Sequence, residues 1–147
     1  MARIVCRFVF EGEAVAKGRP KFARQGGFVR TYTPNKTETY ETAIGMHARL
    51  AMRAAGQPLA ADEAVTVDVL VERKPPKSWS KKKAAAAAGQ PITGKPDADN
   101  LIKAILDGLN DVAFLDDAQV AGLTFFRRWA DADRVTVEVR ALHAEVG

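Results

Sequence analysis

The sequence predicts a single domain of the α+β class, and three observations support this prediction. The chain has 147 residues, a usual length for one domain with a substantial core. Several runs alternate apolar and polar residues, as half-buried strands do, and two longer segments repeat apolar residues at helical spacing. The content of apolar residues, 47%, and of charged residues, 27%, is that of an ordinary globular protein. We therefore expect residues 1–147 to fold together, with a long basic loop at about 73–96.

The first predicted strand covers residues 4–10, where apolar side chains alternate with more polar ones. Cys6 lies on its apolar face and is the only cysteine, so we expect a core residue rather than a nucleophile, and no intrachain disulfide can form. Arg3 and Arg7 interrupt the apolar residues, so this segment does not have the pattern of a signal peptide. No segment has the length and apolarity of a membrane span, and we expect a cytoplasmic protein with no membrane partner.

The next predicted elements are a hairpin and a helix. Residues 16–33 are rich in glycine, arginine and lysine, which predicts a basic hairpin or loop with Gly26 and Gly27 at its turn. Thr33 and Pro34 then have the pattern of an N-cap followed by proline at the first helical position.

The predicted helix after this N-cap ends at Gly56. Apolar residues recur along it at helical spacing and include Leu50. His47 lies on the same apolar stripe, which favours a buried structural histidine over a metal ligand.

A second strand is predicted at residues 65–71, followed by a long connection at 73–96 with at most one short helix, at 80–88. Connections of this length are uncommon in compact domains and tend to be functional or disordered. A lysine run by itself favours a solvated loop. The functional alternative is a basic arm that becomes ordered on nucleic acid, with Trp79 stacking on a base.

The distribution of charge indicates a polyanionic partner. The net charge is only +4, but basic residues are concentrated in residues 17–30 and again in 73–95. An acidic segment, KPDADN at residues 95–100, follows the second of these basic stretches. This pattern is typical of a protein that binds nucleic acid around a centre able to hold a metal ion.

The acidic segment lies at the start of a helix predicted from about residue 99 to 110. Asp97 or Asp99 can cap the free amides of this helix and complement its dipole, and capping alone explains an Asp-x-Asp pair. It does not explain the second acidic pair, Asp116 and Asp117, which precedes a strand predicted at 119–129.

A helix followed by an adjacent strand can bring Asp117 back beside the start of the helix. Three aspartates close to one another raise each other's pKa, and a divalent cation removes this conflict. Mg²⁺ prefers oxygen ligands and often completes its shell with phosphate oxygens, so these residues predict a magnesium site that acts on a phosphodiester. A turn at 131–133 and a last strand at 135–139 complete the expected elements.

Residues 95–120, KPDADNLIKAILDGLNDVAFLDDAQV, resemble the signature of the RusA family of Holliday-junction resolvases, the crossover junction endodeoxyribonucleases of bacteria and their phages. The shared elements are a D-x-D-N-L-x-K run, a helical D-x-L and D-D-x-Q-V, in the same order and spacing. KGRPKF at 17–22 and YTPNKTETYE at 32–41 are similar to the N-terminal half of phage-type members. The chain differs from shorter members in its Lys/Ala-rich segment at 73–95.

This resemblance implies an endonuclease that resolves four-way DNA in recombination and repair by Mg²⁺-dependent hydrolysis, with Mn²⁺ as a substitute metal. It makes Asp97, Asp99 and Asp117 the catalytic, metal-binding carboxylates and Lys103 the active-site lysine. Asp116 is a weaker candidate for the same site.

Asp107 also matches the family motif, and a supporting role suits it better than metal binding. The DNA-binding residues that we expect are basic side chains of the two clusters, which bind phosphates without reading bases: Arg19, Lys21, Arg24, Arg30, Lys81, Lys82 and Lys83.

The resemblance further implies a homodimer, a mixed sheet with two main helices packed on it, and no small-molecule cofactor. Symmetry supports the dimer, because a four-way junction needs two matched cuts and one chain offers one acidic cluster. Two alternatives remain open at this point. The chain could be a branched-DNA-binding protein without catalysis, or a small structural or interaction protein whose acidic pairs only cap helices.

Overall fold

The computed structural model describes residues 2–18, 21–25, 28–32 and 35–143, and for residues 21–25 and 28–32 it describes the backbone alone. A single mixed α+β domain is observed, as the sequence predicts. The elements follow the order β1 (Ala2–Glu11), β2 (Lys21–Gln25), β3 (Phe28–Tyr32), α1 (Asn35–Ala55), β4 (Ala64–Arg73), α2 (Lys81–Ala87), α3 (Ala98–Leu109), a 3₁₀ turn (Asp117–Gln119), β5 (Val120–Trp129) and β6 (Arg134–Leu142).

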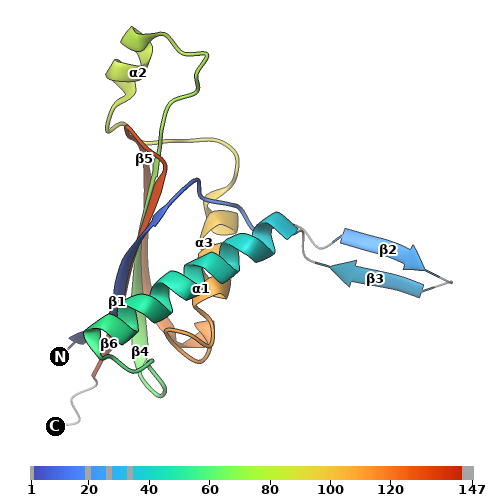
Figure 1. The fold of residues 1–147 in the computed structure, drawn as a ribbon, viewed down its shortest axis with the longest axis vertical. Coiled ribbons are helices and arrows are strands. Elements are labelled where there is room, and N and C mark those ends of the chain that lie inside the picture. Colours follow the sequence, from blue (N-terminus) through green and yellow to red (C-terminus); the bar gives the residue numbers. More distant parts are fainter. Residues whose placement is uncertain (1, 19–20, 26–27, 33–34, 144–147) are drawn as a thin grey trace.

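Four strands form a mixed sheet in the order β1-β6-β4-β5 (Figure 1). β6 runs antiparallel to both β1 and β4, whereas β4 and β5 are parallel. The parallel pair requires a crossover connection, and the chain makes it through the α2 segment and α3. As a result the C-terminal ends of β4 and β5 lie at the same end of the sheet.

The core lies between one face of this sheet and helices α1 and α3. Alternate valines of β4 and β6 are buried, and the residues between them are half-buried or exposed, so the other face is open. Cys6 is buried in this core, and burial raises the pKa of its thiol to about 12. The prediction of Cys6 as a core residue is therefore confirmed.

The buried face of α1 differs from the predicted stripe, most clearly at Leu50. Leu50 is 60% exposed, whereas Ala48 and Met52 are buried. Residues two apart point to different sides of a helix, so Leu50 cannot share the buried side with these two neighbours. His47 is half-buried and stacks on Phe8, with ring centroids 6.0 Å apart, which agrees with a structural role.

Helices α1 and α3 cross at two glycines. A Cβ atom added at Gly45 would lie 2.8 Å from the carbonyl oxygen of Gly108. A Cβ added at Gly108 would lie 2.8 Å from the carbonyl oxygen of Glu41 and 2.9 Å from the Cβ of Ile44. The backbones can approach this closely only because neither residue has a side chain.

Two segments extend away from this body. β2 and β3 pair as an antiparallel hairpin, with Gln25 opposite Phe28, and the hairpin projects beyond the start of α1 (Figure 1). The α2 segment projects from the end of the sheet where β4 ends. The expected turn at Gly26 and Gly27 and the expected cap at Thr33 and Pro34 fall outside the described residues. No helix in the described part of the chain is long and apolar enough to cross a membrane.

Replacing Gly108 by alanine tests the helix crossing. Alanine normally favours a helix over glycine by about 0.5–1 kcal/mol, but here the new methyl group would push α1 away. We expect Gly108→Ala to lower the free energy of unfolding by about 1–3 kcal/mol, as overpacking usually does, measured by urea denaturation. Leu50→Ala compared with Leu50→Gly, at an exposed position of α1, gives the helix preference alone. Unchanged or higher stability of Gly108→Ala would contradict the close crossing.

Candidate active site

The first acidic segment leads into α3. Asp97 occupies the N-cap position, but its side chain makes no capping hydrogen bond. Instead its carboxylate accepts hydrogen bonds from the Lys95 ammonium at 2.9 and 3.0 Å. Asp99 is exposed and accepts a hydrogen bond from the backbone N–H of Asn100 at 3.0 Å. Helix capping therefore does not account for Asp97.

The segment in front of Asp97 is held by a residue of β5. Arg127 donates from Nη1 to the carbonyl oxygen of Pro96 and from Nη2 to that of Gly94, both at 2.8 Å. Both acceptors are backbone atoms, so this contact fixes the path of the chain just before α3 begins.

The two carboxylates of the second acidic pair differ, because Asp116 makes a capping hydrogen bond and Asp117 does not. Asp116 caps the 3₁₀ turn by accepting a hydrogen bond from the N–H of Ala118, and this bond is the main reason that the pKa of Asp116 is lowered. Asp117 shares a hydrogen bond with Asp116, and chiefly for this reason its pKa is raised. Capping thus explains Asp116 but not Asp117.

Asp117 lies near enough to α3 for charges on that helix to act on it. The charges that act on it include Lys103, which lowers its pKa, and Asp107, which raises it.

The described residues contain no group of three His, Cys, Asp or Glu side chains placed to hold a metal ion. The donor chemistry nevertheless fits a hard divalent cation, because all candidate ligands are carboxylates. The raised pKa of Asp117 also reflects negative charge that a cation would balance. Lys103 is exposed on α3, and in the sequence it lies between the two acidic segments.

Lys17 belongs to the site's surroundings, although the sequence suggested only a member of a basic cluster. Its ammonium lies 2.6 Å from the Glu41 carboxylate and 2.9 Å from that of Asp107. Burial lowers the pKa of Lys17, but the hydrogen bonds and charges of the two carboxylates outweigh burial, so the pKa is raised. Its backbone N–H also donates to the carbonyl oxygen of Asn100 at 2.8 Å. Lys17 therefore joins the segment before the hairpin to both helices.

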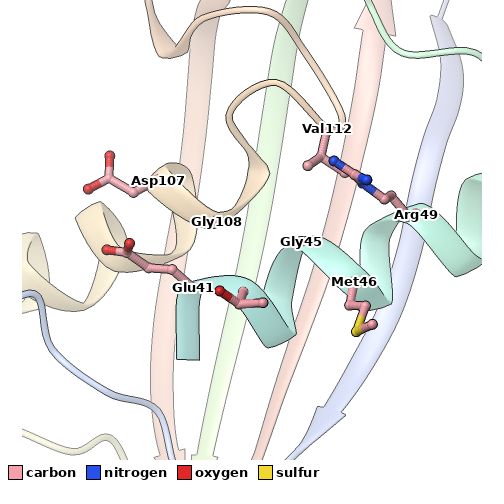
Figure 2. A pocket seen from close by; sticks show the side chains of 8 residues that line it. Glu41, Gly45, Met46, Arg49, Asp107, Gly108 and Val112 are labelled. Carbon is pink, nitrogen blue, oxygen red and sulfur yellow. The ribbon is translucent and has the colours of Figure 1, made fainter. Parts of the chain in front are cut away.

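A shallow pocket lies beside this ion pair, between α1 and α3 (Figure 2). Glu41 and Asp107 lie at one end of it, and Arg49 and Val112 lie at the other. Gly45 and Gly108 form its floor, where the two helices cross.

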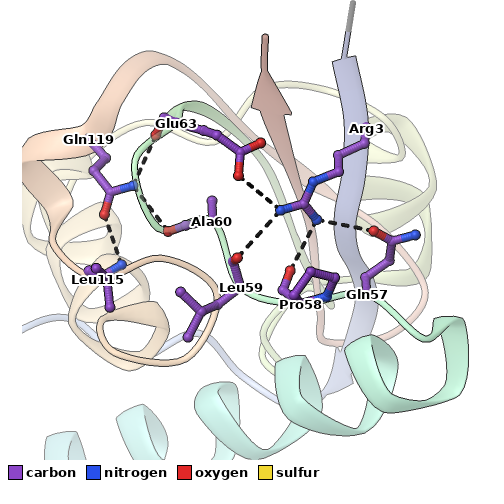
Figure 3. Close-up of polar contacts among 8 residues, drawn as sticks. All are labelled: Arg3, Gln57, Pro58, Leu59, Ala60, Glu63, Leu115 and Gln119. Atoms are coloured by element: carbon purple, nitrogen blue, oxygen red, sulfur yellow. Dashed lines mark hydrogen bonds and ion pairs between the residues drawn. The ribbon is translucent and has the colours of Figure 1, made fainter.

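Gln119 is a second residue with a structural role that the sequence patterns did not predict. Its Oε1 accepts hydrogen bonds from the N–H groups of Leu115 and Asp116, at 2.8 and 3.0 Å. Its Nε2 donates to the carbonyl oxygens of Ala60 and Glu63, at 3.1 and 2.9 Å (Figure 3). The glutamine of the D-x-Q element in DDAQV was the available signal, but a neutral residue carries no charge pattern.

The structure describes the backbone of the two strands of the basic hairpin. Arg19 falls outside the described residues. The expected hairpin strands are confirmed, and their backbones carry Lys21 in β2 opposite Tyr32 in β3, with Arg30 opposite Ala23. Arg24 also lies in β2. The structure does not describe the side chains of these residues.

The long basic connection is folded, and Trp79 is half-buried within it. The Trp79 ring packs on Trp129, with centroids 4.8 Å apart, and the Lys83 ammonium lies 4.4 Å above it. The backbones of Gly89 and Gln90 also bond to that of Trp129. The tryptophan side chains and this backbone pairing together hold the arm against the end of β5.

Helix α2 falls where the sequence places a short helix, and Ser80 caps it by accepting a hydrogen bond from the N–H of Lys83. Lys81, Lys82 and Lys83 are all exposed, so the arm presents positive charge from a folded segment.

Comparison with known proteins gives two results. A family model described as "Endodeoxyribonuclease RusA" matches residues 11–140, which is most of the chain. YqaN of Bacillus subtilis strain 168, described as uncharacterized, is 34% identical over 143 residues, and the alignment covers 94% of this chain and 97% of YqaN.

Proposed function

The chain belongs to the RusA family of endodeoxyribonucleases, and from this premise we propose that it cleaves four-way DNA junctions by metal-dependent hydrolysis of phosphodiester bonds. The observation that carries the proposal is the arrangement on α3. Asp99 and Lys103 lie one turn apart on this helix, and Asp117 is near enough to Lys103 for the lysine to lower its pKa. Asp97 makes no capping bond. Helix capping does not account for Asp97 or Asp117, and both stay exposed to solvent.

We assign the metal ligands to Asp97, Asp99 and Asp117, and the metal to Mg²⁺, with Mn²⁺ as a substitute. A divalent ion held by carboxylates supplies an activated water and stabilises the charge that develops on the phosphate. These three residues fit this role because their oxygens are hard ligands and they are exposed to solvent at the place where DNA would bind.

The remaining charges of the site have separate tasks. Lys103 binds the scissile phosphate, because its exposed ammonium is beside Asp117. Lys17 offsets part of the negative charge of Asp107 and Glu41, so these two carboxylates repel an approaching phosphate less than they would without it. Asp107 thus supports the site without binding the metal.

Both extended segments are assigned to DNA binding. The hairpin contributes Arg19, Lys21, Arg24 and Arg30, and α2 contributes Lys81, Lys82 and Lys83. The substrate is branched DNA, and the contacts go to its phosphates, which fix the position of the duplex arms without reading their sequence. The functional unit is a homodimer, because two acidic clusters related by a two-fold axis match the symmetry of a four-way junction.

The first test replaces the metal ligands. Asp97→Asn, Asp99→Asn and Asp117→Asn should each abolish cleavage of a synthetic junction in Mg²⁺ and leave junction binding unchanged or tighter, since removing negative charge does not weaken binding to phosphates. Cleavage by the wild-type chain should stop in EDTA. Asp131→Asn, at an exposed position in the β5–β6 turn, is the matched control and should cut normally. A ligand variant that cuts at the wild-type rate would remove that residue from the site.

A second test concerns the basic segments. Each phosphate contact contributes about 0.9 log unit to the change in affinity per decade of salt. Arg19→Ala with Lys21→Ala, and separately Lys81→Ala with Lys82→Ala, should therefore each flatten the salt dependence of junction binding by up to about 1.8 log units per decade for each subunit, or about 3.6 for the homodimer. A gel-shift titration at several salt concentrations measures the slope. An unchanged slope for either pair would mean that those side chains stay in solvent when DNA binds.

A third test concerns the proposed homodimer. Light scattering should give about twice the chain mass of 15.9 kDa. A mixed dimer of wild-type and Asp117→Asn chains should nick one strand only, seen on a junction labelled on one strand at a time. A stable monomer that makes paired cuts would refute the symmetric mechanism.

A further inference from the structure

We propose that Gln119 is a positioning residue of the active site: its amide fixes the turn that carries Asp117, so that this carboxylate is held ready for the metal. The inference rests on the proposed function, but the contacts that carry it do not. Gln119 itself touches neither metal nor substrate in this assignment and acts through Asp117.

Gln119 uses both the oxygen and the nitrogen of its amide. Its oxygen accepts the N–H groups of Leu115 and Asp116, which come directly before Asp117. Its nitrogen uses both hydrogens, one for the carbonyl oxygen of Ala60 and one for that of Glu63. Every partner is a backbone atom, so these bonds define the path of the chain and not merely the place of another side chain.

The segment to which Gln119 bonds is itself held in place by other contacts. Arg3, on β1, donates to the Glu63 carboxylate at 3.1 Å and to the carbonyl oxygens of Pro58 and Leu59 (Figure 3). The N–H of Ala60 donates to the carbonyl oxygen of Ala113 at 2.9 Å. Gln119 therefore ties the acidic turn to a segment that two other contacts hold to the sheet and to the end of α3.

The acidic turn itself has little apolar burial. Asp116 and Asp117 are exposed, and so are Leu115 and Ala118 beside them. Apolar burial contributes little to the position of these residues, which leaves the hydrogen bonds to define it. In metal sites, partners that orient the ligands commonly change metal affinity or activity by about 10–100-fold when they are replaced.

Two substitutions separate the halves of the amide. Gln119→Met keeps the length of the side chain and removes all four bonds. Gln119→Glu keeps an oxygen for the two N–H groups but places a carboxylate against the two carbonyl oxygens, so the turn loses its tie to the 60–63 segment. Gln57→Ala is the matched control, because Gln57 accepts a hydrogen bond from Arg3 in the same network but does not contact the acidic turn.

For Gln119→Met and Gln119→Glu we expect the Mg²⁺ concentration that gives half-maximal cleavage to rise by about 10–100-fold. High Mg²⁺ should restore much of the maximal rate, and junction affinity in EDTA should match the wild type, which a general loss of folding would not allow. Gln57→Ala should keep the wild-type Mg²⁺ dependence. Unchanged Mg²⁺ dependence in both Gln119 variants would overturn the proposal, and so would an equal effect of Gln57→Ala.

A readout without catalysis keeps the two proposals apart. Mn²⁺ bound at the site should broaden the NMR signals of Asp117 and Ala118 in the wild type at concentrations that leave Gln119→Met unaffected, and the amides of Leu115 and Asp116 should exchange with solvent faster in that variant. If the wild-type chain bound Mn²⁺ in this way but did not cut junctions, the proposed function would fail and the role of Gln119 would stand. Equal broadening and equal exchange in both proteins would reject the role of Gln119 whether or not junctions are cut.

Discussion

The close contact between α1 and α3 at Gly45 and Gly108 is the constraint on which the rest of the site depends. Because the two backbones are in contact there, α1 and α3 lie close together. Lys17 can therefore bind Asp107 of α3 as well as Glu41 of α1. The remaining exposed side of α3 then carries Asp99 and Lys103 toward solvent. Larger residues at this crossing would move α3 away from α1 and separate the two carboxylates that Lys17 joins.

Around this crossing the protein positions exposed acidic residues with polar bonds to the backbone. Arg127 holds the carbonyl groups before Asp97, and Gln119 holds the amides before Asp117. A residue that must meet a phosphate and a metal cannot be fixed by burial, because burial would exclude both. Hydrogen bonds from half-buried neighbours give order without removing the carboxylates from water.

Local patterns in the sequence predicted most of the elements, and contacts between distant segments account for what was missed. Alternating valines identified β4 and β6, and a short helix was expected where α2 lies. The parallel pairing of β4 with β5 depends on how a crossover packs, which periodicity does not encode. The packing of Trp79 was not predicted because its partner Trp129 lies fifty residues away in sequence, and Lys17 and Gln119 likewise act through partners that only the fold brings near. For the proposed metal site, the sequence predicted its residue types, while the convergence of Asp97 and Asp99 with Asp117 stays a prediction.

The arm that carries α2 also bears on the solubility of the protein. β5 is an outer strand of the sheet, and such a strand offers unpaired N–H and carbonyl groups to strands of other molecules. The chain after α2 returns along the end of β5, where Pro91 faces Arg128 and the backbones of Gln90 and Ile92 bond to those of Trp129 and Arg127. The arm therefore covers part of an edge that would otherwise be open to aggregation, beside the exposed ring of Phe126. A form of this protein without the arm would lose a cluster of lysines and would also expose unpaired backbone groups of β5, which favour aggregation.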